Sequence, residues 1–123
     1  MLVGYWVTAG ILSLLNLAVG GMKLAQSKDK LVASGQAWAV DVSSGVVKLV
    51  GLLEVLGAVG VILPKLLSIA PVLSPFAAIG LALIQVVALI VHVRRAERGN
   101  LPVNAVLILL AAAVAVLGFL TLN

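Results

Sequence analysis

The stretch of sequence that governs the fold is VSSGVVKLVGLLEVLGAVGVIL, residues 42–63. Two charged side chains, Lys48 and Glu54, interrupt its apolar residues, and Pro64 follows it directly. A run of about 20 predominantly apolar residues is long enough to cross the hydrocarbon core of a bilayer as a helix. This stretch therefore predicts a membrane-spanning helix that stops at the proline.

Three further apolar runs flank this one, over about residues 2–22, 75–93 and 102–122. In the whole chain of 123 residues, 63% are hydrophobic and 10% are charged. Soluble domains carry about a quarter charged residues, and a chain this small cannot hide so much apolar surface from water in one core. The predicted fold class is all-α, with residues 1–123 forming a single domain, an integral membrane up-down four-helix bundle.

Two of the connections between the runs have a composition of their own. Residues 23–41 are too polar to span a membrane, and we expect at most a short interfacial helix there, with Trp38 at headgroup depth. The segment from Pro64 to Pro75 contains a third proline, Pro71. It either lies along the interface or begins the third helix early, with Pro71 or Pro75 in the first turn.

The basic side chains predict the orientation of the bundle in the membrane. The first and third connections share one side and carry six of the eight Lys and Arg residues, whereas the other side carries only Lys65; the six are Lys23, Lys28, Lys30, Arg94, Arg95 and Arg98. The positive-inside rule then places both termini outside a bacterial-type cytoplasmic (inner) membrane. Aromatic residues near the outer helix ends are expected to form an interfacial belt; they are Tyr5, Trp6, Phe76 and Phe119.

The composition also excludes several kinds of chemistry. The chain has no cysteine and one histidine. Disulfides, thiol redox chemistry and cysteine-ligated metals are therefore excluded within this chain, and one protomer cannot supply two histidines to a haem. We see no nucleophile–base pair and no metal-ligand set, so we predict no catalytic residue, no metal site and no cofactor held by the chain itself. The scattered basic residues do not predict nucleic-acid binding.

Polar side chains within the predicted spans are the candidate functional residues. At about 1.5 Å per residue, Asn16 and Lys48 lie roughly 10 Å from the cytoplasmic ends of their helices, Gln85 roughly 14 Å and Glu54 roughly 20 Å. His92 and Asn104 lie within about a turn of the cytoplasmic helix ends. Polar groups at such depth face the bundle interior or a water-filled cleft.

From these depths we predict a cytoplasm-facing cleft with Glu54 at its floor and Lys48, Asn16 and Gln85 in its walls. The cleft would accept the polar head of a lipophilic molecule, a quinone or a lipid, whose tail runs between helices. His92 is a further candidate, although a histidine beside two arginines also fits an interfacial position. Asn16 and Lys48 also fit a snorkelling lysine with an amide neighbour.

Small residues share the helix face of Glu54. Gly51 and Ala58 follow i, i+3, i+7 spacing with it, and Gly57 and Gly60 lie beside them. Small residues allow close helix approach in lipid, so all four are predicted helix-packing positions that turn Glu54 toward other helices. Three roles remain open for this carboxyl: a packing contact to an amide such as Gln85, a ligand or proton site, or a contact to another subunit.

One signature runs through these residues. The run K-x-x-G-x-x-E-x-x-G-A-x-G covers residues 48–60, with Gly-Gly-Met-Lys at 20–23 before it and His-Val-Arg-Arg-Ala-Glu at 92–97 after it. In this combination the chain resembles the DoxX-like family of small four-helix membrane proteins. The resemblance implies signature positions at Lys23, Lys48, Gly51, Glu54, Gly57, Pro64, His92 and Glu97.

The resemblance also guides the functional expectations. Relatives in the DoxX-like family are associated with a thiosulfate:quinone oxidoreductase, with membrane redox complexes or with receptor assembly. We therefore expect an accessory or scaffold subunit of a membrane complex. The alternatives are a binding protein for a quinone or lipid, and a small oligomeric transporter. The expected partners are the lipid bilayer and either further copies of the chain or a larger membrane complex.

Overall fold

The computed structural model describes residues 1–33, 39, 43–96 and 101–122. Its long helices are α1 (Leu2–Ala25), α3 (Ser44–Leu67), α4 (Leu73–Arg94) and α5 (Leu101–Leu120), and the short helix α2 (Lys28–Ala33) lies between α1 and α3. All four long helices have the length and hydropathy of a membrane span. The described residues form an all-α bundle with no strand, as the apolar runs predict.

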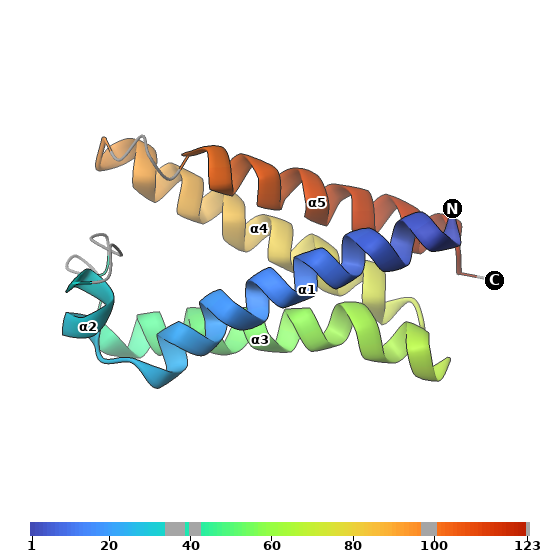
Figure 1. Cartoon of the computed structure of the whole chain (residues 1–123), viewed down its shortest axis with the longest axis horizontal. Helices are drawn as coiled ribbons and strands as arrows, with labels where there is room; N and C mark the ends of the chain where they lie inside the picture. Colours follow the sequence, from blue (N-terminus) through green and yellow to red (C-terminus); the bar gives the residue numbers. More distant parts are fainter. Residues whose placement is uncertain (34–38, 40–42, 97–100, 123) are drawn as a thin grey trace.

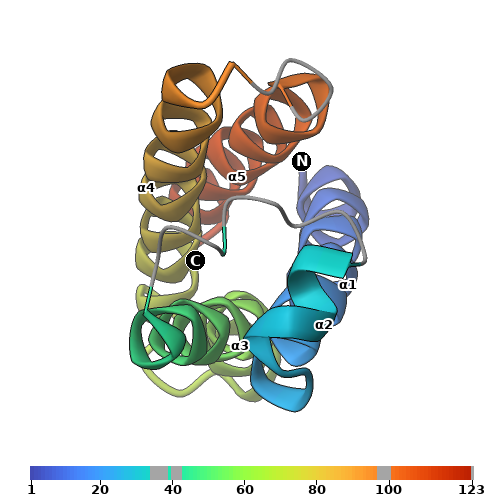
Figure 2. The same cartoon turned by 90° about the vertical axis from the view of Figure 1, so that its left-hand side faces the viewer.

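The four long helices close into a ring. Helix α1 packs against α3, α3 against α4, α4 against α5, and α5 back against α1. Successive long helices run in opposite directions, so both termini and the α3–α4 turn lie at one end of the bundle (Figure 1). We call this the terminal end. The opposite end, which carries the α1–α3 and α4–α5 connections, is the connection end, and Figure 2 views the ring from there.

The bundle has an apolar interior and an apolar exterior. The interior cluster draws on all four long helices; its buried members are Tyr5, Ala9, Leu12, Val61, Ala78, Leu81, Leu107, Ala111, Val114 and Ala115. On the outside, large aliphatic side chains are freely exposed, such as Leu14 and Leu109 at 70% and 69%. Such an exterior suits hydrocarbon rather than water. The chain is a multi-pass membrane protein.

Helix α3 does not stop at Pro64, so the boundary expected there is wrong. The helix begins at Ser44, continues through the proline and ends at Leu67, where Ser68 adopts a left-handed conformation (φ 56°). Proline lacks the N–H that would bind the carbonyl four residues earlier. Nearby groups are bonded from other helices instead: the Tyr5 hydroxyl donates to the Val61 carbonyl at 2.6 Å, and the Lys65 N–H donates to Ser74 Oγ at 3.2 Å.

Other helix boundaries also differ from expectation by a few residues, as at the start of α4 and the end of α1. Helix α4 begins at Leu73, which places Pro75 in its first turn, the second of the two expected arrangements. Helix α1 continues beyond residue 22 to Ala25. The expected short helix between the first two spans is present as α2, whereas Trp38 lies outside the described residues.

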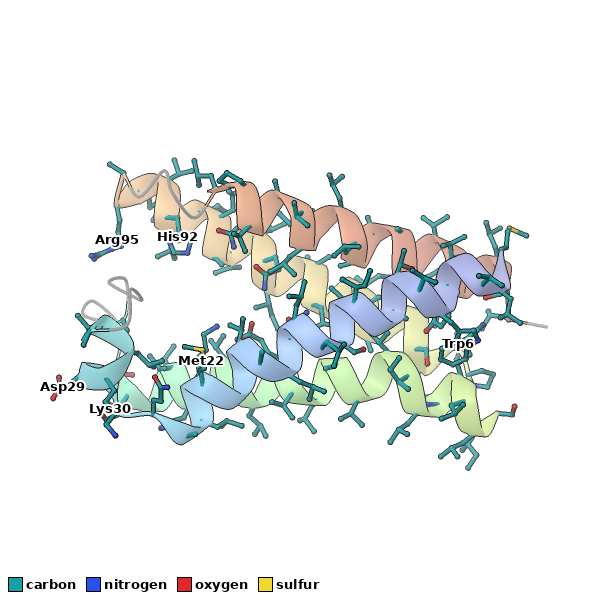
Figure 3. The ribbon with its side chains drawn as sticks, in the orientation of Figure 1. Trp6, Met22, Asp29, Lys30, His92 and Arg95 are labelled. Atoms are coloured by element: carbon teal, nitrogen blue, oxygen red, sulfur yellow. The ribbon has the colours of Figure 1, made fainter. Side chains whose placement is uncertain are left out.

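The expected aromatic belt is wrong for Tyr5. Its side chain is fully buried, because its hydroxyl bonds to α3 and its ring packs in the core. Its neighbour Trp6 meets it edge to face, with ring centroids 5.2 Å apart, and lies near the terminal end (Figure 3). Phe76 and Phe119 form a second edge-to-face pair, at 5.5 Å, and both are exposed on the outside of the bundle.

Candidate functional site

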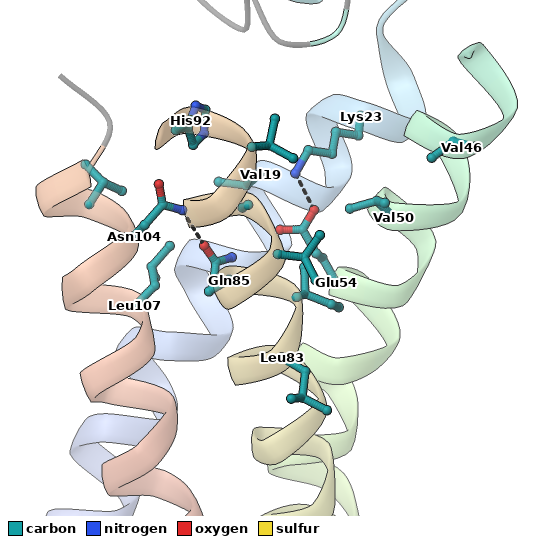
Figure 4. A pocket seen from close by; sticks show the side chains of 15 residues that line it. Val19, Lys23, Val46, Val50, Glu54, Leu83, Gln85, His92, Asn104 and Leu107 are labelled. Atoms are coloured by element: carbon teal, nitrogen blue, oxygen red, sulfur yellow. Dashed lines mark hydrogen bonds and ion pairs between the residues drawn. The ribbon is translucent and has the colours of Figure 1, made fainter. Parts of the chain in front are cut away.

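A pocket of about 460 Å³ lies among the four long helices, on the side of the connection end. Its polar lining residues are Lys23, Glu54, Gln85, His92 and Asn104 (Figure 4). The remaining lining residues are aliphatic: Val19, Val46, Val50, Leu83, Ile84, Val87, Ala88, Val91, Val103 and Leu107. A mostly apolar cavity of this size with a few convergent polar groups has the character of a small-molecule site.

Glu54 is the acidic residue in the lining of the pocket. Its side chain is fully buried, and its Oε1 accepts a hydrogen bond from Lys23 Nζ at 2.5 Å, which joins α3 to α1 in an ion pair. Its other oxygen, Oε2, is also buried and has no hydrogen-bond partner among the described residues. A buried acceptor without a partner is costly.

Two glycines bring the ion pair together. A Cβ added at Gly51 would lie 2.7 Å from the Cβ of Lys23, and one added at Gly20 would lie 3.0 Å from the Cβ of Glu54. Each glycine thus leaves room for the charged residue of the opposite helix. From the crossing at Gly51 the long lysine side chain reaches the carboxylate of Glu54, which lies three residues further along α3.

A second polar pair joins α4 to α5. Asn104 Nδ2 donates to Gln85 Oε1 at 2.9 Å, and both side chains are buried, at 6% and 4% exposed. Asn104 Oδ1 is buried and has no hydrogen-bond partner among the described residues. In Figure 4 the Gln85 side chain lies between those of Asn104 and Glu54. Both pairs line the same pocket, and we refer to them together as the polar cluster.

Three of the five predicted cleft residues line this pocket: Glu54, Gln85 and His92. His92 is buried in the last turn of α4, near the opening at the connection end. Asn104, which the depth argument had grouped with them, also contributes. Whether any of these residues binds a ligand stays a prediction.

Lys48 and Asn16 are not among the lining residues, so the expectation that they wall the cleft is wrong. Lys48 Nζ donates to the Leu24 and Gln26 carbonyls, both at 2.8 Å. It binds there because a cation is stabilised by the free carbonyls at a helix C-terminus. Asn16 Nδ2 donates within α1 to the Leu12 carbonyl at 2.9 Å, and the side chain is buried.

The predicted packing residues divide between two helix interfaces. Gly51 and Ala58 face α1, where the Ser13 hydroxyl donates to the Ala58 carbonyl at 3.0 Å. Gly57 and Gly60 face α4: a Cβ at Gly57 would lie 2.5 Å from a Leu81 methyl carbon, and one at Gly60 would lie 3.0 Å from Ala77 Cβ. Helix α3 thus uses two adjacent small-residue faces rather than one.

Lys23 is the site residue that depth reasoning missed. The residue count treats it as the end of the first span, at the membrane surface, whereas its side chain is buried and turned inward. Its signal in the sequence is the matched spacing Gly20-x-x-Lys23 and Gly51-x-x-Glu54. Glu97, another signature position, lies outside the described residues.

The described residues contain no group of three His, Asp or Glu side chains that would hold a metal ion. What the cluster offers chemically is hydrogen bonding, through two acceptor atoms at the wall of an apolar cavity.

Comparison with known proteins gives a family and no individual relative. Searches of curated proteins and of solved structures each return no significant match. A family model described as the DoxX-like family matches residues 7–114. This span contains every residue that lines the pocket, from Val19 to Leu107. The match covers most of the chain, which is therefore a member of the DoxX-like family.

Proposed function

We propose that this chain binds the polar head of a lipophilic molecule, of the quinone or lipid class, in the pocket at the connection end. The observation that carries the proposal is the fully buried Glu54, which lines an apolar pocket and has one oxygen paired to Lys23 and the other buried without a described partner. Ionisable groups inside a membrane protein are rare and tend to mark ligand or ion sites.

The aliphatic part of the lining supports a membrane-soluble ligand. Leu83 and Val87 of α4 line the pocket and are each 61% exposed on the outside of the bundle. Val46 of α3, 48% exposed, lines it as well. The pocket therefore reaches the lipid-facing surface beside α3 and α4. A ligand tail would leave through this side and remain in the hydrocarbon.

The alternative is that the cluster serves only to hold the helices together. A pocket-filling variant distinguishes the two. Ala88 is half-buried in the lining, so Ala88→Phe fills the cavity with an aromatic ring. Ala105, exposed on α5 and not among the lining residues, provides the control Ala105→Phe. We expect native mass spectrometry after mild extraction to detect a bound lipophilic molecule on the unmodified chain and on the control, and its loss from Ala88→Phe.

Equal retention of the molecule by Ala88→Phe would contradict the proposal. So would an unmodified chain that carries no lipophilic molecule and takes up none on incubation with a quinone or with extracted lipid. In either case the polar cluster would be a packing feature.

A role as an accessory subunit of a membrane complex is a second proposal. It is favoured by membership of the DoxX-like family, because relatives in that family are associated with membrane redox complexes. Co-purification of a membrane enzyme that is lost on Ala88→Phe would support this role. A transporter built from several copies would instead show uptake by proteoliposomes.

We also propose that the connection end faces the cytoplasm of a bacterial-type inner membrane. The described basic residues at that end include Lys23, Lys30, Arg94 and Arg95, against Lys65 at the terminal end, and the positive-inside rule gives the orientation. A reporter fused after residue 122 should be active outside the membrane. A reporter active only in the cytoplasm would reverse the assignment.

A further inference from the structure

We infer that the pocket selects a neutral head group that donates hydrogen bonds, such as a hydroxyl, over one that only accepts them, such as a carbonyl or an ether. The inference rests on the proposed function and narrows the ligand class. It is carried by the two pocket atoms that lack a partner among the described residues, Glu54 Oε2 and Asn104 Oδ1. Both are acceptors.

The first acceptor is held in place by the ion pair. Glu54 Oε1 is engaged by Lys23 at 2.5 Å, and this bond fixes the carboxylate plane. In Figure 4 the other oxygen points to the side of the pocket where Gln85 lies. An O–H donor placed there would form a charge-assisted hydrogen bond, roughly twice as strong as a neutral one. An ether or carbonyl oxygen would face the carboxylate oxygen with no hydrogen between them.

The second acceptor is held by the amide pair. Asn104 donates its N–H to Gln85 at 2.9 Å, which turns Oδ1 away from Gln85. Its side chain lines the same pocket as Glu54, on the opposite side of Gln85. A head group with two hydroxyls, or one hydroxyl and a water, has the donors to serve both oxygens. Partners for both remove the penalty of two buried acceptors.

Charge argues for a neutral donor over an ammonium. The Glu54 carboxylate is already paired with the Lys23 ammonium, so an ammonium ligand would bring a second cation to the same carboxylate, beside aliphatic side chains. A lone charge in a low-dielectric site is strongly disfavoured. A hydroxyl supplies the hydrogen bond without changing the charge of the pocket.

The test uses two isomers with one formula, 1-tetradecanol and 1-methoxytridecane. Both are straight-chain probes, and only the alcohol donates a hydrogen bond. Thermal unfolding of the protein in lipid nanodiscs is followed at matched bilayer mole fractions of each probe. We expect the alcohol to produce a given rise in the unfolding midpoint at a concentration about tenfold lower than the ether, the ratio expected for one hydrogen bond to a charged group.

Three variants test which side chains of the pocket produce the preference for the alcohol over the ether. Glu54→Gln replaces the unpartnered carboxylate oxygen by an N–H donor, because the remaining amide oxygen stays with Lys23. The double variant Gln85→Leu, Asn104→Leu removes Asn104 Oδ1 without freeing Gln85 Oε1, which Asn104 bonds in the unmodified chain. We expect each to reduce the alcohol-to-ether ratio toward one. Asn16→Leu is the matched control, because Asn16 is a buried amide whose Oδ1 also lacks a described partner but which does not line the pocket. It should lower stability and keep the ratio. If Glu54→Gln does not fold, the Gln85→Leu, Asn104→Leu variant carries the test.

The outcomes separate the inference from the proposed function. Equal stabilisation by the two isomers, or a stronger effect of the ether, overturns the donor preference and leaves lipophile binding in place. No stabilisation by either isomer overturns both. An unchanged ratio in both Glu54→Gln and the Gln85→Leu, Asn104→Leu variant also overturns the inference.

Discussion

The two ends of this bundle use similar polar residues for different results. At the terminal end, the Tyr5 hydroxyl bonds to a carbonyl of α3, and Lys65 Nζ donates to both oxygens of Thr121 at 2.7 Å. These bonds connect α1 to α3 and α3 to the end of α5, with no acceptor left over among these groups. At the connection end, the Lys23–Glu54 and Asn104–Gln85 pairs each leave one buried acceptor without a described partner, beside a pocket.

The packing of the helices also differs between the terminal end and the connection end. Near the terminal end, Gly118 lets Pro75 and the Tyr5 ring approach α5, since a Cβ there would lie 3.0 Å from Pro75 Cβ and 3.2 Å from the Tyr5 ring. Near the connection end, the space between the α1–α3 pair and the α4–α5 pair holds the pocket. Polar side chains thus act as packing contacts at the terminal end, and line a candidate site at the connection end, where a pocket lies between the two helix pairs.

The largest expected effect comes from removing one partner of the ion pair. Glu54→Leu leaves Lys23 buried without its carboxylate, and the loss of unfolding free energy should be about 3–5 kcal/mol. The double variant Lys23→Met, Glu54→Leu removes both charges and should recover a large part of that loss. Reversible unfolding in mixed micelles provides the measurement. A double variant as unstable as the single one would mean that shape rather than charge holds this end together.

The next effect tests the close approach of α1 and α3. Gly51→Leu places a side chain where a Cβ alone would meet the Gly20 carbonyl oxygen at 2.9 Å, and overpacking of this kind costs about 1–3 kcal/mol. Gly21→Leu is the control, because a Cβ at Gly21 meets nothing within 4 Å. If both variants unfold at the temperature of the unmodified chain, α1 and α3 do not cross at Gly51.

The smallest expected effect tests whether a change at the terminal end alters ligand preference in the pocket at the connection end. Tyr5→Phe removes the hydroxyl that donates to the Val61 carbonyl, and the expected loss of stability is about 1 kcal/mol. Because Tyr5 is not among the pocket-lining residues, the alcohol-to-ether ratio should stay unchanged. A ratio that moved with Tyr5→Phe would show that the terminal end controls the pocket, and the comparison between the ends would no longer hold.

Hydropathy predicts the fold almost completely, because a membrane restricts the chain to apolar helices of a given length. Boundaries that depend on distant partners are not predictable in this way. Pro64 looks like a stop signal in the local sequence, and only the contacts from Tyr5 and Ser74 explain why the helix continues. The aromatic rule failed for Tyr5 for a related reason: it concerns depth and says nothing about which way a ring faces.

The sequence predicts how far along the helices the site residues lie, but it predicts less well in which direction their side chains point. Counting residues from helix ends grouped Glu54, Gln85, His92 and Asn104 correctly at one side of the bundle. It could not show that Lys48 turns toward the end of α1. It also placed Lys23 at the surface, because a residue count ignores the reach of a lysine side chain and the close crossing at Gly20 and Gly51.

The Lys23–Glu54 pair also determines how the pocket responds to voltage. An elementary charge that crosses a membrane held at 100 mV gains or loses about 2.3 kcal/mol. The pair sums to zero whether its shared proton lies on the nitrogen or on the oxygen, and those atoms are 2.5 Å apart. A neutral molecule that binds beside it moves no net charge through the field. The affinity of such a ligand is therefore expected to be the same in an energised membrane and in a depolarised one.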